Sequence, residues 1–124
     1  MSFQTNWAVA QSFAASRTHR GMPGHLMTVT DYREAAAVKA FFQLSSFWLA
    51  ATNTSGAWIW TDGPEANMTV PSQMSVGILP RTGECAMYTG GSRITSSSCD
   101  VPRFFVIEYE CDLTSSIDDC YGIL

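Results

Sequence analysis

Two short apolar runs with a polar turn between them form the most distinctive pattern in the chain. The first run, residues 47–51, has the sequence Phe-Trp-Leu-Ala-Ala, and the second, residues 57–60, has the sequence Ala-Trp-Ile-Trp. Aromatic side chains pack well on a pleated surface, and Asn, Ser and Gly favour turns, so the pattern predicts two adjacent strands. Trp58 and Trp60 are predicted to share one face of their strand and to form a core with Trp48.

Two other segments show the period of an amphipathic helix. In residues 6–16, apolar side chains recur every three to four positions after Asn6, which can cap a helix. In residues 32–43 the same spacing follows Asp31, another capping residue. The residues predicted to face inward are Trp7, Ala10 and Phe13 or Ala14 in the first helix and Ala35, Val38, Phe41 and Phe42 in the second, with Glu34 and Lys39 outward.

The segments around these helices predict a turn, a strand and a long loop. Pro23 and Gly24 indicate a turn, and residues 25–30 are predicted to form a short strand after it. Residues 64–83 are interrupted by prolines and have neither a helical nor a strand period. Loops of this length in a compact domain are more often functional than idle.

The last third of the chain has mostly strand character. Strands are predicted at residues 84–88 and 103–110, and the polar residues 95–98 are predicted to form a turn. The order helix, strand, helix and then several strands indicates an α+β fold.

Composition narrows the classes of function. The chain has 124 residues, seven Lys and Arg against eleven Asp and Glu, and a net charge of −4. This is the size of one domain, and its acidity argues against nucleic acid, whose phosphates need a basic partner. No apolar run approaches the roughly 20 residues that cross a bilayer, so no membrane insertion is expected. The first residues lack the features of a signal peptide, so a secreted protein would contain this chain as an excised module.

The cysteines and two sequons suit an extracellular setting. Four cysteines lie in the last third of the chain, at Cys85, Cys99, Cys111 and Cys120. An even number favours disulfide bonds, although their spacing allows more than one connectivity, and no Cys-x-x-Cys pair indicates zinc. Sequons at Asn53 and Asn67 lie in predicted loops and are candidates for glycosylation.

No catalytic group is predicted. A structural role is favoured for His19 and His25, the two histidines of the chain. No motif places a histidine to activate the serines of residues 96–98. The acidic residues of the last segment lack the glycine and the terminal glutamate of an EF-hand loop, so a solvated tail is favoured.

Together these segments resemble the C-type lectin-like domain family over residues 7–110. The resemblance rests on the order and spacing of Trp-Ala-Val-Ala at 7–10, Gly-His-Leu-Met-Thr-Val-Thr at 24–30, Trp-Leu-Ala-Ala at 48–51, Trp-Ile-Trp at 58–60 and Phe-Val-Ile-Glu-Tyr at 105–109. It implies two helices packed on small antiparallel sheets, with a long irregular loop region. It also implies a domain at residues 1–110 and a tail or the start of a linker at residues 111–124.

The family carries two disulfide bonds, and the resemblance implies one of them here. Cys85 and Cys99 match the pair that joins the strand after the long loop to the turn before the last strand. The other pair has become apolar at both positions, near Phe13 and at Ile107, which restores packing without a lone thiol. Beyond the usual end of the domain, Cys111 and Cys120 either bridge each other or belong to a link into a following domain.

Sugar-binding members of the family hold Ca²⁺ with groups that this chain lacks. Calcium needs about six to eight oxygen ligands, several of them carboxylates. Neither Glu-Pro-Asn nor Gln-Pro-Asp occurs in residues 64–83, and Ile94, Thr95 and Ser96 occupy the positions of a Trp-Asn-Asp motif. Glu84 is the one acid near Cys85. The resemblance therefore implies no metal ligand and no cofactor.

The resemblance implies an extracellular or cell-surface recognition module that binds a protein or a glycan without Ca²⁺, and no enzyme. The binding surface is expected where residues 64–83 and 90–98 meet beside the Cys85–Cys99 pair. Its candidate residues are Met74, Ile78, Arg81, Glu84, Arg93 and Thr95. The alternatives are a structural spacer of a larger multidomain surface protein, a Ca²⁺-dependent carbohydrate-binding lectin, and an enzyme with cysteine chemistry, which no Cys-His pair supports.

Overall fold

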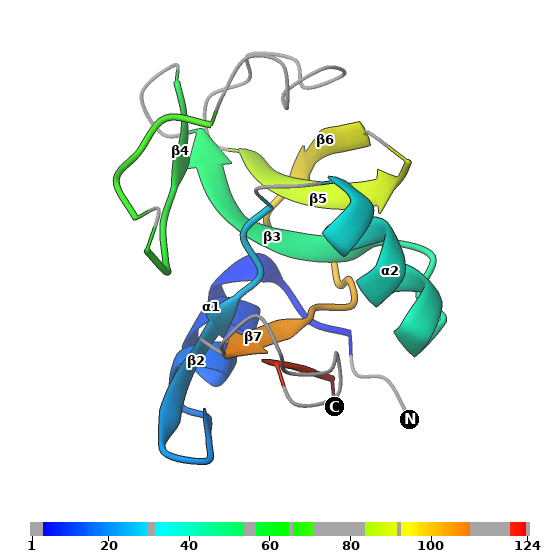
Figure 1. Cartoon of the computed structure of the whole chain (residues 1–124). Coiled ribbons are helices and arrows are strands. Elements are labelled where there is room, and N and C mark those ends of the chain that lie inside the picture. The colour runs from blue at the N-terminus through cyan, green and yellow to red at the C-terminus, as the bar shows by residue number, and fades with distance from the viewer. Residues whose placement is uncertain are drawn as a thin grey trace.

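The structure, a computed structural model, describes residues 4–29, 32–53, 57–64, 66–70, 84–91, 93–109 and 120–123. Its elements are α1 (Trp7–Ala15), β1 (Thr18–His19), β2 (Met22–Leu26), α2 (Tyr32–Phe42), β3 (Phe47–Asn53), β4 (Trp58–Trp60), β5 (Glu84–Gly90), β6 (Arg93–Ser98), β7 (Ile107–Tyr109) and β8 (Tyr121–Gly122) (Figure 1). The predicted α+β class is confirmed. Among the described residues, no helix is long and apolar enough to span a membrane.

The strands form two antiparallel sheets. One sheet has the order β1-β2-β7-β8 and the other the order β4-β3-β5-β6. The predicted pairing of the two apolar runs is confirmed, because β3 and β4 are antiparallel neighbours. An isolated bridge between Trp48 and Phe105 joins β3 to the segment that leads into β7.

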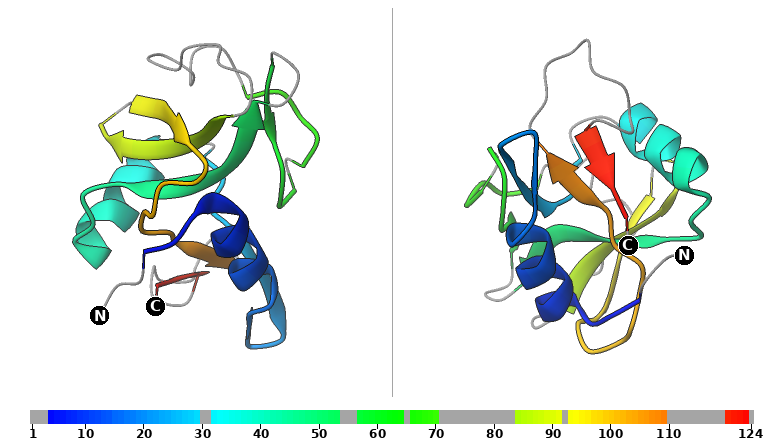
Figure 2. Two further views of the ribbon diagram at one scale, coloured as in Figure 1. Left: turned by 180° about the vertical axis from the view of Figure 1, so that it is seen from behind. Right: turned by 90° about the horizontal axis from the view of Figure 1, so that it is seen from below.

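Strand β3 is buried on both of its faces, and each face supports its own hydrophobic cluster. Phe47, Leu49 and Ala51 belong to a first cluster, which also contains Trp58, Trp60 and the inner face of α2. Trp48 and Ala50 belong to a second cluster with the inner face of α1. The two helices therefore lie on opposite sides of β3 (Figure 2).

The predicted single core of three tryptophans is therefore wrong. Trp58 and Trp60 do share a face, as the spacing predicts, but Trp48 lies in the other cluster. Successive side chains of a strand point to opposite faces, and β3 carries large side chains at both parities. A strand of this kind forms only where both faces are covered.

Both predicted helices are present, and α1 buries the expected stripe. Asn6 caps α1, since its side chain accepts a hydrogen bond from the backbone N–H of Val9. In α2, Ala35 and Val38 are buried as predicted, but Phe41 is 53% exposed. The prediction for Phe41 is wrong because α2 is covered along a narrow face only, on which Phe42 rather than Phe41 packs against the first cluster.

The turn predicted at Pro23 and Gly24 lies earlier in the chain. Arg20 and Gly21 adopt positive φ values of 52° and 78°, and both Pro23 and Gly24 lie inside β2. Gly24 is needed for packing rather than for a turn, since a Cβ atom there would lie 2.7 Å from the carbonyl oxygen of Ala14 and 2.7 Å from Cγ2 of Ile107. The predicted strand at residues 25–30 is therefore shifted toward the N-terminus.

Two further predictions for the last third are corrected. The polar residues 95–98 lie in β6 and are paired with β5, so they form a strand and not a turn. The strand predicted at residues 103–110 is regular only in β7, because Arg103 and Phe105 make isolated bridges to different partners. Beyond residue 110, where the sequence predicts a tail, β8 pairs with β7, and Tyr121 is buried in the first cluster.

Candidate functional site

The disulfide bond between Cys85 and Cys99 ties β5 to the residue that follows β6. Its sulfur atoms are 2.03 Å apart and its Cα atoms 5.2 Å apart, which confirms the predicted pair. Cys85 is buried in the second cluster, and Cys99 packs against it. Cys120 is also disulfide-bonded. Because Cys111 lies outside the described residues, the pairing of these two cysteines stays a prediction.

The structure describes the side chains of two of the six candidate binding residues. Met74, Ile78 and Arg81 lie outside the described residues. Arg93 begins β6, but its side chain is not described. Glu84 and Thr95 are both half-buried, in β5 and β6.

Glu84 and Thr95 lie on opposite faces of the β5–β6 ladder. Glu84 is paired with Ser98 and Thr95 with Met87, with no shift of register between these positions. Because side chains alternate along a strand, Thr95 shares its face with Met87 and Ser97, whereas Glu84 points to the other side. The two candidates are therefore not part of a single compact site.

The first residues of the long loop continue the sheet along β4. The backbone N–H of Trp60 donates to the carbonyl oxygen of Met68 at 2.9 Å, and the N–H of Val70 donates to the carbonyl oxygen of Trp58 at 2.9 Å. Val70 is buried in the first cluster, while the side chain of Met68 is 60% exposed. The tryptophan core thus anchors this end of the loop and leaves Met68 at the surface.

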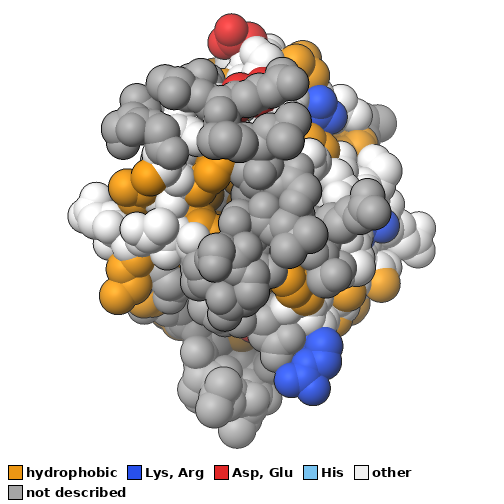
Figure 3. All heavy atoms as spheres, turned by 90° about the horizontal axis from the view of Figure 1, so that it is seen from above, with side chains coloured by type: hydrophobic (Ala, Val, Ile, Leu, Met, Phe, Trp, Pro, Cys, Tyr) orange, Lys and Arg blue, Asp and Glu red, His pale blue; other side chains and the backbone are white. Residues whose placement is uncertain are grey.

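Hydrophobic side chains are exposed at the end of the molecule that carries β4, β5 and β6. Figure 3 shows this end from above, with orange side chains on either side of the grey atoms and charged side chains at the edges. The exposed thioether of Met68 belongs to the loop segment beside β4. A flexible, polarizable side chain of this kind suits an adaptable contact surface.

The two sequons differ in accessibility. Asn53 is the last residue of β3 and is 0% exposed, so its predicted loop position is wrong. Strand β3 continues through Thr52 and Asn53, which were expected to begin the turn, because Asn53 pairs with both Trp58 and Glu84. Asn67 is exposed, with a φ of 71°, and stays a candidate for glycosylation.

His25 occupies a buried packing position. Its Nδ1 atom is hydrogen-bonded to the carbonyl oxygen of Leu26. Its ring lies against Gly63, where a Cβ atom would be 2.8 Å from Cε1 of the histidine, and Gly63 has a φ of 76°. His19 is half-buried and lies 5.4 Å from the ring of Tyr109, measured between centroids. Both positions agree with a structural role.

The phenol of Tyr121 connects the last described strand to α2 and β7. Burial raises its pKa far above the usual range, and the charges of Glu108 and Glu34 and a hydrogen bond with Glu34 add to this effect. Burial also raises the pKa values of Tyr32 and Tyr88. These tyrosines are therefore held in their neutral form in the folded protein.

The free energy of unfolding is expected to fall as the pH rises above about 10. A group whose pKa is raised on folding contributes stability below its unfolded pKa, which is 10.0 for Tyr121, and loses that contribution at higher pH. Tyr121→Phe should weaken this alkaline dependence while costing about 1 kcal/mol at neutral pH, because the hydrogen bond with Glu34 is lost. Urea unfolding between pH 8 and about 11 measures both effects, and an unchanged pH dependence would contradict the assignment.

The residues present do not provide a calcium site in the described part of the chain. No group of three or more His, Cys, Asp or Glu side chains that could hold a metal ion occurs among the described residues. On β6, Thr95 and Ser96 present neutral hydroxyl groups, and Ile94 is buried in the first cluster. Calcium requires several carboxylate oxygens, which this strand does not supply.

A comparison with protein families shows the family to which this chain belongs. The family model of the C-type lectin domain matches residues 5–109. The chain belongs to the C-type lectin domain family. The match covers both helices and both sheets apart from β8, and it agrees with the resemblance stated from the sequence motifs.

Solved C-type lectin folds resemble this chain at low sequence identity. TC14, a C-type lectin from the tunicate Polyandrocarpa misakiensis, has a TM-score of 0.62 and 23% identity, covering 90% of this chain and 95% of its own. Natural killer cell receptor Ly49C has a TM-score of 0.59 and 16% identity, covering 98% of this chain and 81% of its own. A mutant of human REG IV protein has a TM-score of 0.55 and 17% identity, covering 90% of this chain and 87% of its own.

Sequence similarity also extends to a much longer protein. In an alignment 67 positions long that covers 52% of this chain, the sequence is 34% identical to halomucin of Haloquadratum walsbyi. The match spans 1% of the length of halomucin. The C-type lectin domain family supports a role in ligand recognition.

Proposed function

We propose that this C-type lectin domain is an extracellular recognition module that binds a protein or glycan ligand without Ca²⁺. In this proposal the ligand contacts residues of the loop 64–83 together with residues of β5 and β6. Candidate contacts are Met74, Ile78, Arg81, Glu84, Arg93 and Thr95, to which the exposed Met68 is added. Because Glu84 and Thr95 face opposite sides of the ladder, they contact different parts of the ligand or different ligands.

The run of hydroxyl side chains at residues 95–98 of β6 carries the proposal of metal independence. Thr95, Ser96 and Ser97 are half-buried on β6, the edge strand that pairs with β5. Their hydroxyl groups donate and accept hydrogen bonds, but they provide no negative charge to balance a divalent cation. Such a strand suits direct hydrogen bonding to a ligand.

A place within a larger protein is also proposed. The similarity to a small part of halomucin supports this arrangement, in which the domain is a module of a longer chain. The family supports an extracellular or cell-surface location. A spacer without a ligand is the competing arrangement, and binding measurements separate the two.

Calcium is expected to leave the thermal stability of the domain unchanged. Millimolar Ca²⁺ and an excess of EDTA should give melting temperatures within about 1 °C of each other, because a ligand stabilises only a folded state that binds it. Differential scanning fluorimetry measures the shift, with a calcium-binding C-type lectin as positive control. A clear stabilisation by Ca²⁺ would show that the loop supplies ligands and would overturn the proposal.

The loop surface is tested by binding rather than by stability. A glycan array and a protein pulldown should each be repeated with Met68→Ala and Arg81→Ala. Phe41→Ala is the matched control, since it removes an exposed apolar side chain from α2, on another part of the surface. Binding that survives both loop substitutions would place the site elsewhere, and a complete lack of ligands would favour the spacer.

A further inference from the structure

Arg103 is held rigidly beside the disulfide bond. Its backbone N–H donates to the carbonyl oxygen of Thr5 at 2.9 Å, and its carbonyl oxygen accepts the N–H of Thr5 at 3.0 Å. Its guanidinium lies 5.7 Å from the centroid of the Trp48 ring. Nε and Nη2 both donate to Oγ of Ser97, at 3.2 and 2.8 Å. Backbone, aromatic ring and hydroxyl together fix the direction of this half-buried cation.

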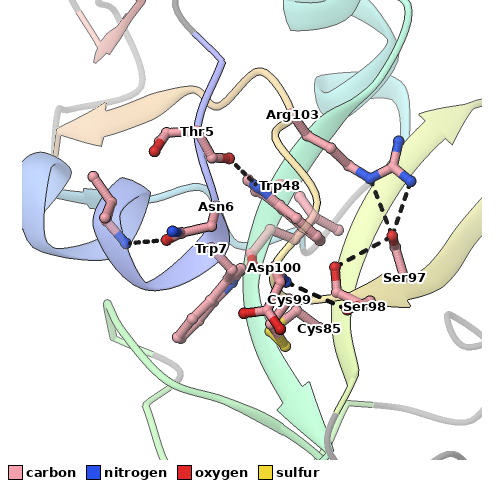
Figure 4. The surroundings of a disulfide bond; sticks show 12 residues. Thr5, Asn6, Trp7, Trp48, Cys85, Ser97, Ser98, Cys99, Asp100 and Arg103 are labelled. Atoms are coloured by element: carbon pink, nitrogen blue, oxygen red, sulfur yellow. Dashed lines mark hydrogen bonds between the residues drawn. A yellow bond between two sulfur atoms is a disulfide. The ribbon is translucent and has the colours of Figure 1, made fainter.

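One edge of this guanidinium has no partner among the residues that the structure describes. Arginine has five N–H donors, and Ser97 accepts from only two of them. Figure 4 shows the third nitrogen of Arg103 without a hydrogen bond and directed away from Ser97. The edge formed by Nη1 and Nη2 keeps one donor on each nitrogen, which is the geometry that binds a carboxylate or sulfate with two parallel hydrogen bonds.

The described side-chain partners of Arg103 are an aromatic ring and a hydroxyl group. Its side chain makes no ion pair within the part of the chain that the structure describes, and its partner on β6 is a neutral hydroxyl group. Thr95 and Ser97 lie on the same face of β6, so hydroxyl groups line the strand next to the cation. A half-buried charge without a counter-ion is costly and gains from an external anion.

We propose that Arg103, Ser97 and Thr95 form a subsite for the carboxylate or sulfate group of an acidic saccharide. The anion binds the free edge of Arg103, and hydroxyl groups of the sugar pair with those of β6. A saccharide fits this face better than a peptide, because protein contacts depend on buried aromatic and aliphatic anchors. Of the exposed large hydrophobic side chains among the described residues, Val101 alone lies in the segment between β6 and Arg103.

The subsite shares Thr95 with the candidate contacts of the loop surface, whereas Arg103 and Ser97 are not among those contacts. It lies on the face of β6 that carries Thr95 and Ser97, opposite to the face of Glu84. Loss of binding through Met68→Ala and loss through Arg103→Lys report on different surfaces, so either proposal can fail alone.

The test compares a charged saccharide with its neutral counterpart. Sialyllactose and lactose are titrated into the ¹⁵N-labelled domain, and dissociation constants are taken from chemical-shift changes. Sialyllactose should bind and lactose should bind at least about tenfold more weakly. Arg103→Lys keeps the charge but loses the two-pronged geometry, and it should weaken sialyllactose at least about tenfold.

A matched control separates this site from general charge attraction. Arg17 is exposed and also lies over an aromatic ring, 4.7 Å from the centroid of Phe13, so Arg17→Lys makes the same chemical change elsewhere. It should leave sialyllactose binding unchanged within about twofold. Ser97→Ala removes the hydroxyl that orients the guanidinium and should weaken binding, which provides a second variant if Arg103→Lys fails to fold.

Several results would overturn the proposal. Equal affinity for sialyllactose and lactose, or unchanged affinity in both Arg103→Lys and Ser97→Ala, would remove the subsite. Binding of inorganic sulfate without binding of either sialyllactose or a sulfated disaccharide would indicate an adventitious ion only. Binding of a Glu-rich peptide in place of the saccharides would make the ligand a protein.

Discussion

Trp48→Ala is expected to lower the free energy of unfolding by about 3–5 kcal/mol, the largest loss among the changes considered. Trp48 is 0% exposed and lies in the second cluster. Its Nε1–H donates to the carbonyl oxygen of Thr5 at 3.0 Å, so the ring also holds the segment before α1. Removing the ring leaves a cavity and removes one of the two hydrogen bonds to the Thr5 carbonyl oxygen, which still accepts from the N–H of Arg103. Urea unfolding followed by circular dichroism measures the loss.

Two further variants separate the contributions of Trp48. Trp48→Phe keeps much of the apolar volume but loses the N–H donor, and should cost about 1–2 kcal/mol. Phe41→Ala removes an aromatic side chain that is 53% exposed and should change stability by about 0.5 kcal/mol or less. If Trp48→Ala cost no more than Phe41→Ala, the second cluster would not be a core.

The double variant Cys85→Ala, Cys99→Ala is expected to lose about 3 kcal/mol of stability. The bond closes a loop between residues that are 14 positions apart, and its removal increases the entropy of the unfolded chain. Both alanines fit in the second cluster without leaving a lone thiol, so the change reports the cross-link more than the packing. Chemical denaturation of the two proteins under non-reducing conditions measures the difference.

The same pair allows an independent check. Peptide mapping without reduction should recover a Cys85–Cys99 cross-link from the parent protein and none from the double variant. If the double variant unfolded at the same denaturant concentration as the parent, the bond would contribute nothing to stability. A loss well above 3 kcal/mol would mean that the alanines also disturb the pairing of β5 with β6.

Local sequence patterns were sufficient to predict both helices and the pairing of two neighbouring strands. Both helices follow from apolar spacing and, for α1, from a capping asparagine. The pairing of β3 with β4 follows from two apolar runs and the polar residues between them. The position of the Cys85–Cys99 bond followed from the family resemblance.

Parts of the candidate site were out of reach of the sequence. The separation of Glu84 from Thr95 depends on the register of β5 and β6, which no local pattern specifies. Arg103 was not among the candidates. Its partners Thr5 and Trp48 are distant along the chain, and Ser97 is one of several similar polar residues in a row. A lone arginine before a strand gives no local sign of a free, oriented edge.

The sequence by itself determined the family, the α+β class and the two helices. The tertiary structure alone decided that β3 is covered on both faces, that Asn53 is buried and that Tyr121 enters the core. The physical reason is that alternation along a strand divides side chains between two faces, whereas the packing of distant elements decides which face is covered.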